Sequence, residues 1–131
     1  MREVISTAII HDNRILLVRK KQTWILPGGK PEGEESHFSC LEREITEEIP
    51  DKRLGKLTIS KFYNSFTGKT PHTGDIAKVF VYFANFENYV ENPKTAREID
   101  KAEWASNFSD YKLSESAEKI INSLKKEGYL K

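Results

Sequence analysis

The chain has 131 residues, of which 37% are hydrophobic and 31% are charged. This length suits one domain with a hydrophobic core of its own, and the spread of Ile, Val, Leu, Phe and Tyr along the chain argues against disorder. The 21 Lys and Arg residues nearly balance the 20 Asp and Glu residues, and the net charge of +1 creates no overall field for nucleic acid or an anionic membrane. We expect a single domain over residues 1–131.

The chain carries one cysteine, Cys40, so no disulfide can form within it, which suits a reducing compartment. The first ten residues lack the pattern of a signal peptide, and no apolar run approaches the roughly 20 residues that span a bilayer. A soluble, cytoplasmic protein without a membrane partner is expected.

The first half of the chain begins with strand patterns. Residues 3–11 and 14–19 are rich in β-branched side chains and flank Asp12-Asn13, a pair that favours tight turns, so they predict a hairpin of two largely buried strands. The basic run Arg19-Lys20-Lys21 follows. It is either a solvated strand end or a group of phosphate contacts.

The second half predicts further strands at 56–67, 75–86 and 98–105, with loops at 68–74 and 88–95. The alternation within 75–86 indicates a strand that is buried on both faces. Residues 114–127 place one apolar stripe on a helix that Gly128 ends. Strands and helices do not follow a regular βαβ order, so a mixed-sheet α/β fold with helices packed on the sheets is expected.

The most informative stretch lies between residues 26 and 51. On a helical period over 35–49, an apolar stripe that includes Leu41 and Ile45 lies beside a stripe of three glutamates, Glu44, Glu47 and Glu48. Like charges at these spacings destabilise an isolated helix by a few tenths of a kcal/mol per pair. The alternative is a solvated acidic face, but residues 34–48 hold six glutamates and one arginine. This excess favours a site for a hard divalent cation, since Mg²⁺ binds a few carboxylates together with phosphate oxygens of a substrate.

A glycine pair, Gly28-Gly29, precedes this helix and allows backbone to approach a ligand closely. It does not form a phosphate-binding P-loop, because Gly29-Lys30 is followed by Pro31 and the Ser or Thr of that motif is missing. The glycines must therefore serve a different kind of site.

Seven positions from Gly29 through Glu35 to Arg43-Glu44-Ile45-Thr46-Glu47-Glu48 match the pattern G-x5-E-x7-R-E-U-x-E-E-x-G-U, in which U is a bulky aliphatic residue. The stretch 29–51 therefore resembles the Nudix box, and the whole chain resembles a single-domain, MutT-like member of the Nudix hydrolase family. The resemblance implies a Nudix-type α/β/α sandwich, in which a mixed β-sheet carries a catalytic helix and a C-terminal helix. It also implies hydrolysis of a nucleoside diphosphate linked to another moiety, with Mg²⁺ or Mn²⁺ as cofactor.

The resemblance assigns roles to residues of the box. Glu44, Glu47, Glu48 and the carbonyl of Gly29 would be metal ligands, with Glu47 and Glu48 also catalytic. Arg43 would act in catalysis by orienting the carboxylates.

Other residues would support or extend this site. Glu35 would be largely structural, with an outer role at the metal. Arg19, Lys20 and Lys30 would meet the phosphate charge. Trp24 would contact the base, although Trp24, Tyr63, Phe66 and Trp104 are each more typical of a core than of a stacking platform.

Two features of the site stay open in the sequence. The catalytic base is either Glu47 or Glu48, or one of four acids expected on loops: Asp75, Glu87, Glu98 and Glu103. The glycine and the aliphatic residue that end the Nudix box are Pro50 and Asp51 here. Because proline disfavours the α conformation in the residue before it, we expect the helix to stop by Glu48, with Ile49 already extended.

A small domain without added modules is similar to the members of this family that cleave nucleoside triphosphates and release pyrophosphate, in nucleotide-pool housekeeping. The alternatives are an ADP-ribose or dinucleoside polyphosphate hydrolase, and a non-catalytic module that binds nucleotide or RNA. The module is disfavoured because all box glutamates are retained. The expected partner is a small nucleotide, without stable binding to nucleic acid, and a homodimer is left open.

Overall fold

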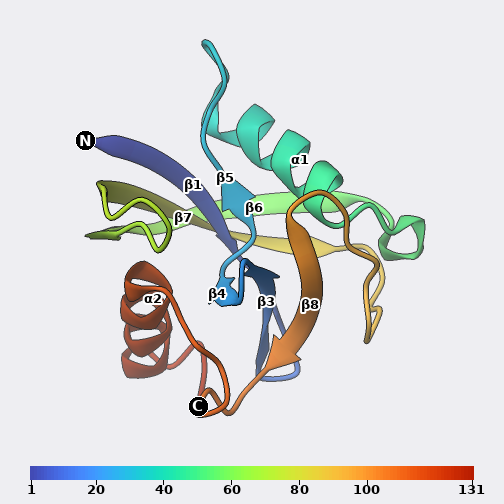
Figure 1. Cartoon of the computed structure of the whole chain (residues 1–131). Coiled ribbons are helices and arrows are strands. Elements are labelled where there is room, and N and C mark those ends of the chain that lie inside the picture. Colours follow the sequence, from blue (N-terminus) through green and yellow to red (C-terminus); the bar gives the residue numbers. More distant parts are fainter.

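The computed structural model describes all residues from 1 to 131. The elements are β1 (Arg2–Ala8), β2 (Ile10–His11), β3 (Arg14–Lys20), β4 (Thr23–Ile25), β5 (Gly28–Gly29), α1 (His37–Glu48), the 3₁₀ turn η1 (Lys52–Leu54), β6 (Leu57–Lys69), β7 (Ile76–Phe86), β8 (Ile99–Ala105) and α2 (Glu115–Lys126). The helix α1 lies on one side of the sheet that contains β1, β7 and β6, and α2 lies on its other side, next to the strands β3, β4 and β8 (Figure 1). The mixed α/β class and the α/β/α arrangement expected from the sequence are confirmed.

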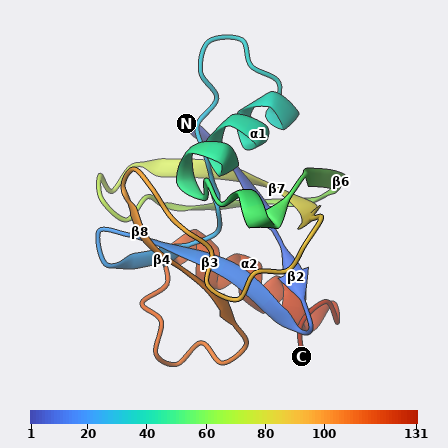
Figure 2. The ribbon, with the colours of Figure 1, turned by 90° about the vertical axis from the view of Figure 1, so that its right-hand side faces the viewer.

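The strands form two sheets. The first has the order β5-β1-β7-β6, and β1 runs parallel to β7 while the other pairs are antiparallel. The second is built around β3, which pairs antiparallel with β2, β4 and β8. Figure 2 shows the second sheet from the side, with α1 and the first sheet above it.

The predicted first hairpin is correct at its turn and wrong in its extent. Asp12 and Asn13 have φ of 50° and 61°, and His11 pairs with Arg14, as in a two-residue turn with both central residues in the left-handed region. The hairpin strand is only Ile10–His11, because β1 belongs to the other sheet and pairs with β7. The sequence does not reveal that the chain changes sheets between β1 and β2, since a strand buried in either sheet has the same apolar pattern.

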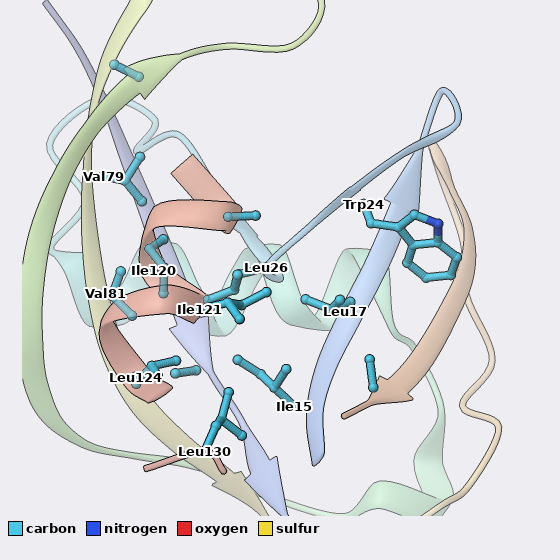
Figure 3. Packing of buried hydrophobic residues seen from close by; sticks show 14 residues of the cluster. Ile15, Leu17, Trp24, Leu26, Val79, Val81, Ile120, Ile121, Leu124 and Leu130 are labelled. Carbon is cyan, nitrogen blue, oxygen red and sulfur yellow. The ribbon is translucent and has the colours of Figure 1, made fainter. Parts of the chain in front are cut away.

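The main core lies between α2 and the two sheets. In Figure 3 the α2 residues Ile120, Ile121 and Leu124 face side chains of both sheets, including Val81 and Ile15. The helix begins as predicted, since the Ser114 hydroxyl accepts from the N–H of Ala117 at 3.2 Å. Its apolar stripe therefore joins the two sheets into one structure.

The strand β7 is buried on one face and only partly buried on the other. Ala77, Val79 and Val81 are buried against α2, but Ile76 on the other face is 45% exposed. The prediction of burial on both faces therefore holds only in part, because α1 covers that face over Phe80 and Tyr82 but does not reach Ile76.

The helix α1 ends where the proline predicts. It runs to Glu48, and Ile49 has left the helix with φ of −130°. Asp51 is buried, and its carboxylate caps η1 and accepts from the N–H of Lys94 at 2.9 Å and from the Arg53 guanidinium. The two residues that depart from the box thus form a polar anchor between the helix exit and the β7–β8 connection. Neither helix is long and apolar enough to cross a membrane.

Candidate functional site

An open cleft of about 800 Å³ brings together parts of the chain that are far apart in sequence. Its walls come from β1, the β3–β4 turn, residues 25–32, the last turns of α1, the β6–β7 loop, residues 97–99 and the first half of α2. Glu44, Glu47 and Glu48 all line it. The three glutamates that the helical period placed on one stripe therefore face one cavity.

Docking of α1 explains this orientation. Cys40, Leu41 and Ile45 are buried beneath the helix, with Cys40 and Leu41 in a small cluster with Ile5 of β1. Because side chains three and four positions apart share a helix face, the glutamates beside this stripe turn toward the edge of the sheet. That edge is β5.

The glycine pair lets β5 fit between β1 and α1. A Cβ on Gly28 would lie 2.0 Å from the carbonyl oxygen of Ile5, and one on Gly29 would lie 2.3 Å from Cδ of Glu44. No side chain fits at either position without moving backbone or the carboxylate. The glycines thus permit close approach of the strand to the helix, and they place the Gly29 backbone against Glu44.

Arg43 gathers the carboxylates. Its guanidinium donates to both oxygens of Glu35 at 2.7 and 2.9 Å, to Glu44 at 2.8 Å and to Glu47 at 3.2 Å. The Arg43 hydrogen bonds, with a further one from the N–H of Glu32, lower the pKa of Glu35 to about 2. Glu35 therefore stays ionised and holds Arg43 in place, the arrangement expected if Arg43 orients the other carboxylates.

Glu48 is the most deeply buried carboxyl group of the site. It is 9% exposed and accepts from the N–H of Gly28 at 3.1 Å. Burial, reinforced by the nearby charge of Glu44, raises its pKa to about 8, although the Gly28 N–H and Lys20 act in the opposite direction. Burial also raises the pKa of Glu44, against the opposing effect of Arg43. A cation at this position would remove the cost of ionising both groups.

The donor chemistry fits a divalent cation. Glu44, Glu47, Glu48 and the Gly29 carbonyl supply only hard oxygen ligands, as Mg²⁺ and Mn²⁺ prefer. In this conformation, however, no three His, Cys, Asp or Glu side chains converge closely enough to hold an ion. Arg43 instead forms ion pairs with both Glu44 and Glu47, at 2.8 and 3.2 Å.

Among the predicted phosphate contacts, Lys20 and Lys30 line the cleft and Arg19 does not. Arg19 instead donates to both oxygens of Asp100 at 2.9 and 2.8 Å. Lys20 forms an ion pair with Glu98 at 2.9 Å. Alternation along β3 places adjacent side chains on opposite faces, which separates Arg19 from Lys20.

Only one of the four acids predicted as alternative catalytic bases lies at the cleft. Glu98 lines the cleft, and the other three do not. Asp75 lies 3.7 Å from Arg2 in an ion pair, Glu87 accepts from the N–H of Lys56, and Glu103 accepts from the Tyr111 hydroxyl at 2.8 Å. Glu98 is therefore the loop acid that the fold brings to the box glutamates.

The aromatic candidates are part of the scaffold. Trp24 is 7% exposed and packs edge-on against Tyr111, with ring centroids 4.9 Å apart. Tyr63 hydrogen-bonds Ser123 of α2, and the indole N–H of Trp104 donates to a backbone carbonyl. No Phe, Tyr or Trp lines the cleft. The structure thus does not bring Trp24 to the site, because the inward face of β4 is needed for the core.

Several cleft residues carry no motif. Five of them carry an ammonium, guanidinium or imidazole group: Arg2, Lys21, Lys69, His72 and Arg97. Lys21 and Arg97 adopt positive φ, 48° and 62°, which costs a residue other than glycine about 1–2 kcal/mol. The only sequence signal was the basic run that ends at Lys21, because the others come from three separate segments that meet only in the folded chain.

A family model described as the NUDIX domain matches residues 1–121. The chain therefore belongs to the Nudix hydrolase family, enzymes that act on pyrophosphate bonds and generally use divalent metal ions. The resemblance stated from the box is confirmed.

Solved structures support the fold. The MutT protein from Methanosarcina mazei Go1 is similar with a TM-score of 0.77 and 18% identity, covering 96% of this chain and 94% of that chain. A MutT Nudix hydrolase from Burkholderia pseudomallei is similar with a TM-score of 0.73 and 23% identity, covering 92% and 95%. In sequence, the chain is 29% identical over 130 residues to the m7GpppN-mRNA hydrolase of Saccharomyces cerevisiae, which covers 91% of this chain and 12% of that protein. The chain thus spans about one eighth of the length of this curated relative.

Proposed function

We propose that the protein hydrolyses a nucleoside triphosphate to the monophosphate and pyrophosphate with Mg²⁺ or Mn²⁺. The observation that carries the proposal is the meeting of Glu44, Glu47 and Glu48 with the Gly29 backbone at one end of a cleft that also contains Lys20 and Lys30. Carboxylates for a metal beside cations for phosphate are the two parts that phosphoryl transfer requires.

In this proposal Glu44, Glu47, Glu48 and the Gly29 carbonyl hold the metal. When bound, the metal neutralises phosphate charge and lowers the pKa of a water molecule. Arg43 positions the carboxylates through its bonds to Glu35 and Glu44.

The chain's own acids supply the base. Glu47 is the most accessible of the box carboxylates, with 30% of its side chain exposed, against 19% for Glu44. Glu98 lines the same cleft but is held by Lys20. We therefore favour Glu47 as the group that takes the proton of the attacking water. Lys20 and Lys30 would bind the phosphate groups of the substrate.

The test is a panel of nucleoside triphosphates, ADP-ribose and dinucleoside polyphosphates with Mg²⁺ or Mn²⁺, with products separated by chromatography. We expect triphosphates to yield pyrophosphate, and Glu47→Gln to lower kcat by at least about 100-fold, the usual effect of losing a positioned general base. The matched control is Glu42→Gln, an exposed glutamate of the same helix that does not line the cleft. Equal, low turnover by wild type and Glu47→Gln across the panel would refute the proposal.

A dinucleoside polyphosphate is the second candidate substrate. The relative at 29% identity is named as a hydrolase of m7GpppN-mRNA, in which two nucleosides are joined through phosphates. The same panel separates the two candidates, since cleavage of this substrate releases a nucleotide and no pyrophosphate. Preferential cleavage of the dinucleoside compounds would favour this second reading.

A further inference from the structure

The lining of the cleft contains no flat ring on which a nucleobase would stack, other than the imidazole of His72. The uncharged part of the lining combines aliphatic side chains, including Val79 and Ile120, with the hydroxyl groups of Ser6, Ser114 and Ser116. Proteins that hold bases without hydrogen-bond readout do so mainly by stacking on aromatic rings. In this chain the Phe, Tyr and Trp rings are placed elsewhere, with Trp24 packed on Tyr111.

The cleft is rich in cations instead. Six Lys and Arg residues line it: Arg2, Lys20, Lys21, Lys30, Lys69 and Arg97. Lys20 is paired with Glu98 and Arg2 with Asp75. The remaining four form no ion pair with any acid of the chain. Four positive charges therefore line the cleft without an ion-pair partner in the protein.

One of the paired cations lies in the same cavity as the glutamates. Lys20 lines the cleft with Glu44, Glu47 and Glu48, and its ammonium group lies 2.9 Å from Glu98. Lys21 follows it in the β3–β4 turn, and His72 comes from the β6–β7 loop. The cations and the carboxylates therefore share one cleft.

Two of the unpaired cations are held in unfavourable backbone conformations. Lys21 occupies the first central position of the β3–β4 turn, where both central residues have positive φ. Asn-Gly or Asp-Gly suits such a turn best, yet this chain has Lys21-Gln22. Arg97, just before β8, has φ of 62°. Both residues nevertheless place a charged side chain in the lining of the cleft.

We propose that the cleft selects its substrate by the length of the phosphate chain and not by the base, so that the substrate class is polyphosphate esters of three or more phosphates. This inference rests on the proposed hydrolysis of phosphoanhydrides. Each added phosphate brings negative charge to the unpaired cations. No Phe, Tyr or Trp ring is present to stack on a base, and the serine and threonine hydroxyl groups of the lining both donate and accept, so they can pair with any base.

The test begins with binding, so that it does not depend on turnover. The Glu47→Gln protein is titrated with Mg²⁺ and each of these probes: the four nucleoside triphosphates, a nucleoside monophosphate and diphosphate, a nucleoside tetraphosphate and inorganic tripolyphosphate. We expect the four bases to agree within about threefold, tripolyphosphate to bind within about tenfold of them, and affinity to rise by about fivefold per added phosphate, the upper range of an exposed ion pair.

Charge-removing variants then locate the effect. Lys21→Gln with Arg97→Gln should flatten the dependence on phosphate number and weaken tetraphosphate binding by about 5–25-fold, while leaving monophosphate binding nearly unchanged. Lys126→Gln, an exposed lysine of α2 that does not line the cleft, is the matched control. Preserved circular dichroism and melting temperature would show that the double variant is folded.

The outcomes separate this inference from the proposed function. A preference of more than tenfold for one base, or loss of such a preference in His72→Ala, overturns selection by phosphate length. Equal affinity for monophosphates and tetraphosphates overturns it as well. Binding that follows phosphate number in a wild-type protein that hydrolyses none of the probes supports the inference about recognition and refutes the hydrolase proposal.

Discussion

Replacing Glu48 by glutamine should remove a large part of the pH dependence of stability of the metal-free protein. The Glu48 carboxyl group has a pKa of about 8 in the folded chain, because it is buried, and an ordinary value of 4.5 when unfolded. Between these values the folded protein keeps a proton that the unfolded chain releases. The free energy of unfolding contributed by Glu48 is therefore fully present below pH 4.5 and is lost as the pH rises toward 8.

The size of this effect follows from the shift. Between pH 4.5 and pH 8, each pH unit lowers the free energy of unfolding by about 1.4 kcal/mol, so the full pKa shift corresponds to at most about 5 kcal/mol. Between pH 5 and pH 8 we expect about 2–4 kcal/mol, since relaxation around a buried group reduces the ideal value. Glutamine stays neutral at every pH and keeps an oxygen for the N–H of Gly28, so it should remove this loss without removing the hydrogen bond.

The measurement is urea unfolding at pH 5 and pH 8 in the presence of a chelator, for wild type, Glu48→Gln and the exposed control Glu42→Gln. The control should follow wild type. Adding Mg²⁺ at pH 8 should stabilise wild type more than Glu48→Gln, because a bound cation stabilises the ionised carboxylate. Parallel stability profiles for wild type and Glu48→Gln between pH 5 and pH 8 would refute the reasoning.

Three further predictions concern the scaffold. Gly29→Ala places a Cβ 2.3 Å from Cδ of Glu44 and should lower kcat by about 100-fold in a steady-state assay, since a displacement of about 1 Å can have that effect; unchanged kcat would contradict it. The contacts with Arg53 and Lys94 lower the pKa of Asp51, so the stability that Asp51 contributes is present at neutral pH and is lost as the pH falls below its unfolded pKa of 3.8. The melting temperatures of wild type and Asp51→Asn should therefore converge at acid pH. A constant difference between them from pH 7 to pH 2 would be inconsistent with this role. Leu124→Ala opens a cavity in the main core and should cost about 2–5 kcal/mol in denaturant unfolding, with a loss below 1 kcal/mol counting against the packing described.

Most of the local structure was predictable from local chemistry. The end of α1 at Glu48 follows from Pro50, and the start of α2 follows from Ser114. The tight turn at Asp12-Asn13 follows from residues that tolerate positive φ. In each case the determining atoms lie within a few residues of one another.

The prediction of phosphate and base contacts was less complete for a physical reason. Arg19 and Lys20 are adjacent in sequence, yet their side chains leave opposite faces of β3, and only Lys20 reaches the cleft. The Trp24 ring could stack on a nucleobase, but its position in β4 packs it into the core. Which face of a strand is buried depends on the sheet that the strand joins. That pairing is set by contacts between residues far apart in the sequence.

The sequence by itself determined the family, the acidic face of the helix and the place where that helix ends, because spacing along one helix and the constraints of glycine and proline are local. Only the tertiary structure decided that Arg43 holds Glu44 and Glu47, that Glu48 is buried, and that Asp51 anchors the exit. It also decided that Lys21, Lys69 and Arg97 join the glutamates at one cleft. These residues come from separate parts of the chain. They are brought together by the pairing of strands that are distant in sequence, and no local pattern specifies that pairing.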